Sequence, residues 1–361
     1  MLDIIFNMYK IKYVKLNELL KTEYPGLKPY STVSVFINLE NIINKLATTY
    51  TDEYLRVKNE EKIFEFISNV INIAAHYRAF FISSKIYCKV YLYLPYPFKM
   101  SLQKNKTINY EYRKYYEYKF NKNPTNYVLS ETISSSIEFI QTICEYIDGV
   151  YFITSGNIEN SVIPYIIMNE NQDVDANFIV STNQYDFQYV NIGGKILVPN
   201  KENSMLLTSD NIIDYVCSNH NIVNNSSVTA GHLPFILSVI GNKQRNIYNL
   251  KGYGVKTVFK ALQTAINKSV ISPDTTNINL LLHLINEKFH SQVLSNFYCT
   301  DIVYQYNNLL KKDIYYIMSQ LKDKYDNNSL KKINDMYFTQ YPINIIEVTK
   351  QVASKKRNVI F

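Results

Sequence analysis

The sequence has no tryptophan and little glycine, proline or cysteine. Its 361 residues include 9 Gly, 10 Pro and 4 Cys. So few glycines and prolines exclude collagen-like and linker-rich chains. The cysteines, at 88, 144, 217 and 299, form no CxxC pair, and the five histidines form no HxxxH or HExxH motif. The usual zinc motifs are therefore excluded, and reduced, buried thiols are expected.

Long apolar runs are also absent. No stretch reaches the roughly 20 residues that a membrane helix needs, and the first twelve residues mix charge with apolar side chains. We therefore expect a protein without a signal peptide or a membrane partner, in the cytoplasm, or in a virion if the source is viral. With 47% hydrophobic and 19% charged residues, the composition is that of a globular protein with a large core.

Arginine is scarce, while lysine and tyrosine are abundant. Only five of the 38 basic residues are Arg, and 33 residues are Tyr. The codons of an AT-rich genome produce such a bias, so composition reports on the genome before it reports on function. The net charge of +7 permits an anionic partner such as nucleic acid without requiring one.

Hydrophobic periodicity predicts an α/β protein. Helical patterns at 13–23, 60–83, 130–147 and 158–168 alternate with strand-like runs, which lie at 32–37, 89–94, 149–153, 177–181, 186–190 and 195–199. This alternation predicts a central, mostly parallel sheet with flanking helices.

Only helical patterns follow residue 208. They cover 210–218, 232–240, 255–268, 277–294 and 301–324. We predict an N-terminal helical segment (1–29), an α/β domain (30–207), a helical domain (208–340) and a basic C-terminal tail (341–361).

A glycine turn joins two of these helical patterns. Gly252 and Gly254 precede the pattern at 255–268, with Lys251 and Lys256 on either side. Such a turn lets backbone amides approach a phosphate, with the N-terminus of the next helix pointing at it. The motif is often only structural, so its context decides its meaning.

Residues 241–258 resemble the helix–three-turn–helix of the flap endonuclease and phage-type 5′-exonuclease family. The matching residues are Gly241, Asn246, Ile247, Gly252, Gly254, Lys256 and Thr257. Further segments resemble the family in the correct order between about 30 and 270, namely 33–41, 89–94, 110–119, 156–163 and 179–188. The resemblance implies a PIN-like α/β nuclease fold followed by a helix–three-turn–helix at about 232–268. In that family the turn grips duplex DNA, often with a monovalent cation at its Gly-x-Gly carbonyls.

The family's metal-binding carboxylates are missing from the matching positions. These positions carry Asn38, Asn160, Ser161, Asn183, Tyr185, Asn242 and Arg245. Amide oxygens bind Mg²⁺ poorly without carboxylate neighbours, and an arginine repels the ion. We therefore predict a pseudo-enzyme with no catalytic residues and no resident metal. The remaining acids Glu40, Glu159 and Asp186 would hold one Mg²⁺ or Mn²⁺ only if a reduced site were active.

Two basic regions are candidates for DNA contacts. The turn region carries Lys243, Arg245, Lys251, Gly252, Gly254, Lys256, Thr257 and Lys260, and a segment at the place of the family's helical arch carries Arg113, Lys114, Tyr115 and Lys119. The turn would bind the DNA backbone without sequence preference, and the arch segment suits a single strand. A monovalent cation at the Gly252–Gly254 turn is the cofactor that the resemblance leaves open.

Three functions stay open. The first is an inactive, sequence-independent DNA-binding protein of a phage or other virus. The second is a structural or adaptor component of a virion or polymerase complex, with other viral proteins as partners. The third is a divergent, metal-dependent 5′-nuclease with a reduced site.

Overall fold

The computed structural model of the chain describes residues 13–39, 42, 60–94, 140–145, 147–155, 158–199, 204–223, 227–242, 247–272 and 275–321. Several predicted site residues lie outside these ranges: Glu40, Arg113, Lys114, Tyr115, Lys119, Lys243 and Arg245. The predicted basic tail (341–361) lies outside them as well.

A six-stranded sheet forms the centre of the molecule, in the order β3-β2-β1-β4-β5-β6. Its strands are β1 (Thr32–Asn38), β2 (Tyr87–Leu94), β3 (Val150–Thr154), β4 (Ala176–Val180), β5 (Gly194–Val198) and β6 (Met205–Leu207). The first five strands are parallel, and β6 pairs antiparallel with β5. The predicted mostly parallel α/β sheet is confirmed.

The strand order changes direction at β1. From β1 the chain adds β2 and β3 on one side, then returns to the other side for β4, β5 and β6. In open parallel sheets, ligands bind beyond the carboxyl ends of the strands where the order reverses. The carboxyl ends of β1 and β4 are therefore the place in this fold where a ligand site is expected.

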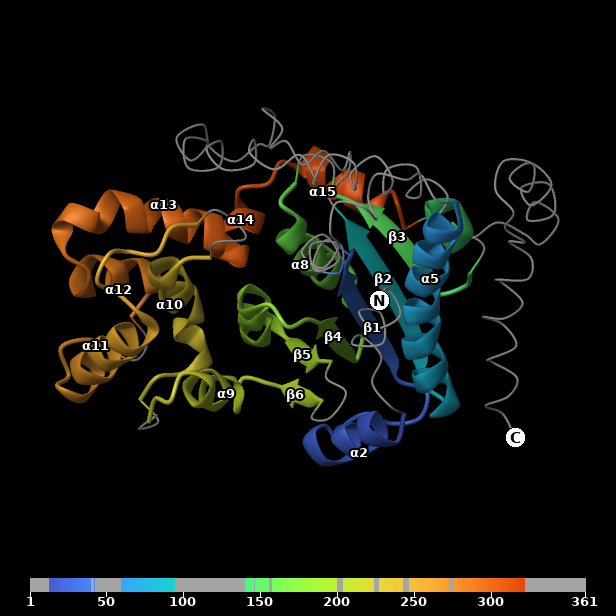
Figure 1. Cartoon of the computed structure of the whole chain (residues 1–361), viewed down its shortest axis with the longest axis horizontal. Helices are drawn as coiled ribbons and strands as arrows, with labels where there is room; N and C mark the ends of the chain where they lie inside the picture. Colours follow the sequence, from blue (N-terminus) through green and yellow to red (C-terminus); the bar gives the residue numbers. More distant parts are fainter. Residues whose placement is uncertain are drawn as a thin grey trace.

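Helices cover both faces of the sheet, because the strands are apolar on both sides. Val90 and Leu92 of β2 face a core shared with α2 (Tyr13–Glu23) and α5 (Glu60–Ser83). Tyr91 and Tyr93 face the opposite core, shared with α8 (Ile163–Glu170) and the 3₁₀ segment η4 (Gln184–Ile192). Figure 1 shows α5 along one side of the sheet and α8 near the ends of its strands.

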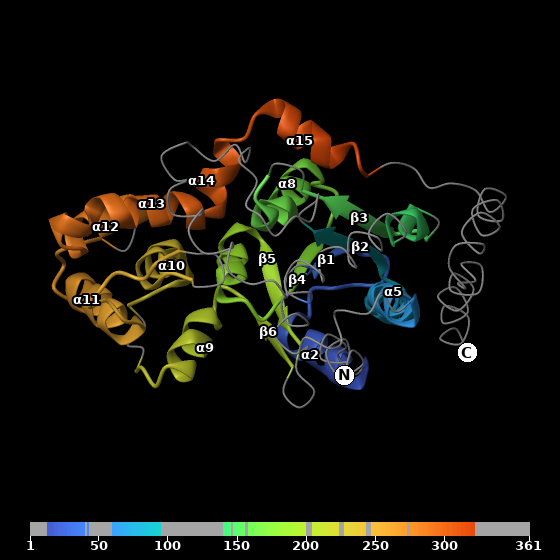
Figure 2. The same cartoon turned by 45° about the horizontal axis from the view of Figure 1, so that its top comes forward.

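The helical region lies beyond β5 and β6 (Figure 1). Its helices are α9 (Ile212–Asn219), α10 (Leu233–Ile240), α11 (Val255–Asn267), α12 (Asn277–Leu284), α13 (His290–Thr300), α14 (Ile302–Asn307) and α15 (Lys311–Met318). The last of them, α15, returns to lie beside α8 and β3 (Figure 2). None of the described helices is long and apolar enough to cross a membrane.

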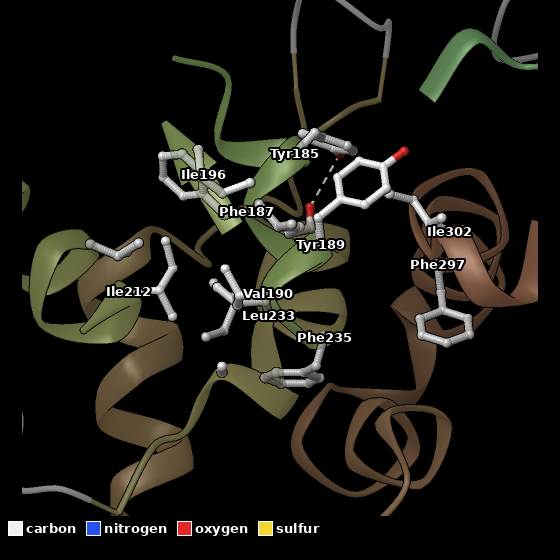
Figure 3. Close-up of a cluster of buried hydrophobic side chains, with 14 of the residues drawn as sticks. Tyr185, Phe187, Tyr189, Val190, Ile196, Ile212, Leu233, Phe235, Phe297 and Ile302 are labelled. Carbon is white, nitrogen blue, oxygen red and sulfur yellow. Dashed lines mark hydrogen bonds between the residues drawn. The ribbon is translucent and has the colours of Figure 1, made fainter. Parts of the chain in front are cut away.

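One hydrophobic core joins the sheet to the helical region. Figure 3 shows Phe187 and Val190 of η4 close to Leu233 and Phe235 of α10, with Phe297 of α13 nearby. All five side chains are at most 7% exposed. The second half of the described chain therefore packs as a continuation of the sheet's own core.

The structure corrects several predicted elements. Residues 186–190 are not a strand: they belong to η4, whose start is capped by the side chain of Asn183 accepting a hydrogen bond from the backbone N–H of Tyr185. Strand β6 was not predicted, because three residues are too short to show a period. The helices predicted at 277–294 and 301–324 are each interrupted, at Ile285–Asn286 and at 308–310.

Candidate nucleic-acid interface and the carboxyl edge of the sheet

Polar residues gather where β1, β3 and β4 end. We call the following set the carboxyl-edge cluster: Asn38, Thr154, Ser155, Asn160, Ser161, Ser181 and Asp186. Each of these residues is at most 5% exposed. The cluster is therefore a buried polar network.

An amide pair lies at the centre of the cluster. The Asn160 Nδ2 group donates a hydrogen bond to Asn38 Oδ1 over 2.9 Å, and both side chains are buried. Asn38 ends β1, and Asn160 begins the 3₁₀ turn η3 (Asn160–Val162) that leads into α8. The family that the sequence resembles carries acids at these two positions. Here two uncharged side chains, 122 residues apart in the sequence, share a hydrogen bond.

The remaining acid of the cluster is bound by its own loop. Asp186 is fully buried, and its carboxylate accepts a hydrogen bond from the Ser181 hydroxyl. The same Ser181 Oγ accepts the backbone N–H of Asn183 at 2.9 Å. The carboxylate therefore closes the turn between β4 and η4, and its oxygens are directed into the protein rather than toward solvent.

These donors do not fit a divalent metal site of the two-metal kind. Mg²⁺ prefers several carboxylate and water oxygens in an octahedral arrangement. In the described ranges, no group of three or more Asp, Glu, His or Cys side chains is close enough to hold a metal ion. Glu159, the other remaining acid that the structure describes, is partly exposed, next to η3.

Helix α15 covers the end of β3. The Gln320 side chain, just past the helix, accepts the Thr154 backbone N–H at 2.8 Å and donates to the Thr154 backbone carbonyl at 3.0 Å. The Thr154 hydroxyl is 2.9 Å from the Tyr316 hydroxyl. A side-chain amide thus takes the place of a neighbouring strand, and the polar backbone at this strand end is satisfied.

Further hydrogen bonds tie the edge to the helical region. The Tyr189 hydroxyl donates to the Ser161 backbone carbonyl. Gln188 donates to the carbonyl of Thr300 at 3.0 Å and accepts the backbone N–H of Ile302 at 3.1 Å. Tyr185, which was predicted at a lost metal position, is a core residue, 2% exposed.

The segment that leads into the glycine turn begins where α10 ends. Gly241 ends that helix with φ +65° and ψ −179°, and a Cβ there would lie 2.5 Å from the nitrogen of Asn249. Next to it, Asn242 and Ile247 exchange two backbone hydrogen bonds, of 2.8 and 3.0 Å. The predicted lost-acid position at Asn242 therefore belongs to an antiparallel bridge with Ile247.

Buried contacts fix the turn from the inside. The Asn296 side-chain amide donates to the carbonyls of Ser238 and Tyr248, at 2.8 Å each. The Tyr253 ring packs edge-on against Phe289, with ring centroids 6.0 Å apart. These contacts hold the turn against α10, α13 and Phe289 just before α13, without using its outer surface.

The outer surface of the turn and of α11 carries the predicted contact residues. Lys251, Gly252, Gly254, Lys256, Thr257 and Lys260 are all exposed. Gly252 has φ +89°, and Gly254 is the N-cap of α11, an end of the helix that no side-chain hydrogen bond caps. The first backbone N–H groups of a helix lack an intrahelical partner. The buried side chains Val258, Phe259 and Leu262 occupy the other face. The structure thus places exposed lysine side chains beside the N-terminus of α11.

The structure brings the predicted residues together in two separate places. Asn38, Asn160, Ser161, Asn183 and Asp186 meet at the carboxyl edge, and the turn residues meet at α11, on the far side of α10 from β1 (Figures 1 and 2). Sequence reasoning missed Ser181, Thr154 and Gln320. Single polar residues without a motif give no signal, and their role follows from tertiary packing alone.

Solved structures align with most of the chain. The bacteriophage T5 5′-exonuclease with bound zinc aligns at a TM-score of 0.48 and 10% identity, over 80% of this chain and 98% of that one. A bacteriophage T5 flap endonuclease, described as a pseudo-enzyme–product complex with DNA and metal ions, gives 0.45 and 11%, over 90% and 99%. Human GEN1 in complex with Holliday junction DNA gives 0.40 and 9%, over 88% and 71%.

Sequence comparison finds no such similarity. No model of a protein family matches the chain, and no curated protein is similar to it in sequence.

Proposed function

We propose that this chain is a catalytically inactive protein of the 5′-nuclease type that binds the DNA backbone without sequence specificity. The observation that carries the proposal is the buried amide pair of Asn38 and Asn160 at the switch point of the sheet. A two-metal reaction needs carboxylates there, because the metals' charge stabilises both the attacking and the leaving oxygen.

Burial of the carboxyl-edge cluster supports the inactive state. A scissile phosphate has to reach the strand ends, yet Ser155 and Asp186 are fully buried and α15 is bonded across Thr154. No divalent cofactor is part of the proposal. A monovalent cation at the Gly252–Gly254 turn stays part of the proposal, on the strength of the family resemblance.

The exposed surface of the turn and α11 supports DNA as the partner. Lys251, Lys256 and Lys260 are exposed in or next to the first turns of α11, and the N-terminus of a helix favours phosphate oxygens. Such contacts read charge and backbone spacing, so the binding is independent of base sequence. The phage or viral setting rests on the AT-rich codon bias and on the phage-type branch of the family that the sequence resembles.

The first experiment tests activity. The purified protein is incubated with an end-labelled 5′-flap DNA and with either Mg²⁺ or Mn²⁺, and we expect no cleavage. Cleavage that is abolished by Glu40→Gln, Glu159→Gln or Asp186→Asn would overturn the proposal and establish a reduced metal site.

The second experiment tests binding through its salt dependence. Each phosphate contact contributes a slope of about −0.9 to the plot of log affinity against log salt for duplex DNA. The double variant Lys251→Glu/Lys256→Glu should therefore flatten the slope by about 2 and weaken all duplex sequences alike. Lys21→Glu, at an exposed position of α2, is the control.

Absence of DNA binding at low salt would favour the adaptor function instead. In that case other viral proteins become the partners to seek.

A further inference from the structure

Helix α15 has one face turned to the protein and one turned to solvent. On the inner side, Ile317 is fully buried and Tyr316 and Gln320 bond to Thr154 of β3. On the outer side are Lys311, Lys312 and Tyr315, all exposed. The inner contacts hold the helix against the end of β3.

The outer face carries an aromatic ring that the fold leaves in solvent. Tyr315 is 74% exposed, and among the large hydrophobic side chains that the structure describes only Tyr30 and Val223 exceed it. Lys311 stands one helical turn before Tyr315, so the two side chains are neighbours on the same face. An exposed ring beside a cation is the pairing that single-strand-binding proteins use for base stacking and phosphate contact.

The charge of this face favours an anion. Lys311 and Lys312 are exposed, whereas the helix's acid, Asp313, is partly buried and accepts the backbone N–H of Leu310 at 3.3 Å. The acid thus caps the start of the helix, and two lysines with one tyrosine face outward.

We propose that the outer face of α15 binds an unpaired strand of nucleic acid, with Lys311 and Lys312 at phosphates and a base stacked on Tyr315. Bases within a duplex stack on each other, so the ring discriminates in favour of an unpaired strand. The inference rests on the proposed DNA binding and adds a second contact to it. Helix α15 is well separated from α11 in both views, so the two contacts are independent (Figures 1 and 2).

The test compares two probes by fluorescence anisotropy, a labelled oligothymidylate and a blunt duplex. Tyr315→Ala should weaken oligothymidylate binding about 5- to 150-fold and leave duplex binding unchanged. Tyr315→Phe, which keeps the ring, should retain wild-type affinity. Tyr30→Ala, at an exposed tyrosine on the opposite, amino-terminal side of the sheet, is the matched control and should change neither.

The lysines are tested through salt dependence. Lys311→Ala/Lys312→Ala should reduce the oligothymidylate slope by about 1.4, at about 0.7 for each phosphate of a single strand. Lys21→Ala on α2 is the control.

The proposals fail in distinguishable ways. Oligothymidylate affinity unchanged by Tyr315→Ala, or duplex affinity reduced equally, overturns the role of α15 while the turn remains a duplex contact. Duplex binding that survives Lys251→Glu/Lys256→Glu overturns the proposed role of the turn. A wild-type protein that binds neither probe at low salt overturns both proposals.

Discussion

The amide pair of the carboxyl edge can be tested by replacing one amide at a time with a carboxyl group. Asn160 is the donor and Asn38 the acceptor, 2.9 Å apart and buried. The change Asn160→Asp keeps the shape and removes the donor, so two acceptors face each other. An unsatisfied buried acceptor costs about 1–3 kcal/mol, so we expect about 2–6 kcal/mol of lost stability at pH 7.5.

The change Asn38→Asp should cost less stability than Asn160→Asp. Asn38→Asp keeps an acceptor opposite the Asn160 Nδ2 donor, and a charge-assisted hydrogen bond offsets part of the cost of burying the carboxylate. The order of the two variants therefore reports which amide donates. Each 1.4 kcal/mol between them is a tenfold difference in the unfolding equilibrium.

The assay is urea unfolding followed by circular dichroism, in EDTA, at pH 7.5 and at pH 4.5. Burial should raise the pKa of the carboxyl group introduced by Asn160→Asp above its ordinary value of about 3.9. The protonated group can donate to Asn38, so the loss of stability should be small at acid pH and grow as the pH rises. An Asn160→Asp protein as stable as wild type at pH 7.5, or less affected than Asn38→Asp, would refute the assigned donor and acceptor.

Three further changes follow from the structure. Gly241→Ala should destabilise the protein by about 1–3 kcal/mol or more in thermal unfolding, because glycine alone tolerates this backbone conformation and a Cβ would meet the Asn249 backbone at 2.5 Å; an unchanged melting temperature would contradict this. Gln320→Ala should leave the Thr154 amide unprotected in hydrogen exchange, while the exchange of Val35 in central β1 stays slow. Burial lowers the pKa of His232, an effect that the Thr229 backbone partly offsets. As the pH falls, this histidine is therefore protonated in the unfolded chain before it is protonated in the folded protein, and stability should fall as the pH drops through about 6.5. His232→Gln should flatten the profile in that range, and a profile with the wild-type slope would rule out this histidine as the cause.

Much of the fold was predictable from local patterns. Runs such as Thr32–Ile37 are apolar on both faces, and only strands of a covered parallel sheet bury both faces. Helical periodicity predicted the helix at Glu60–Ser83. The glycines before α11 predicted the turn there, because glycine adopts backbone conformations that other residues avoid. The prediction of a strand at 186–190 was wrong, because a 3₁₀ segment that is buried on every side shows no hydrophobic period that distinguishes it from a strand.

The carboxyl edge shows the limit of that approach. The sequence by itself determined that Asn38 and Asn160 are amides rather than acids, and so that the chemistry of a carboxylate cluster is missing at these two positions. It also determined the basic, glycine-bearing turn, because side-chain charge and backbone freedom are properties of single residues. Only the tertiary structure decided that the two amides pair, that Asp186 is enclosed by Ser181, and that Gln320 covers the end of β3. These contacts join residues up to 166 positions apart, and burial and hydrogen-bond partners at such separations arise only when the whole chain has packed.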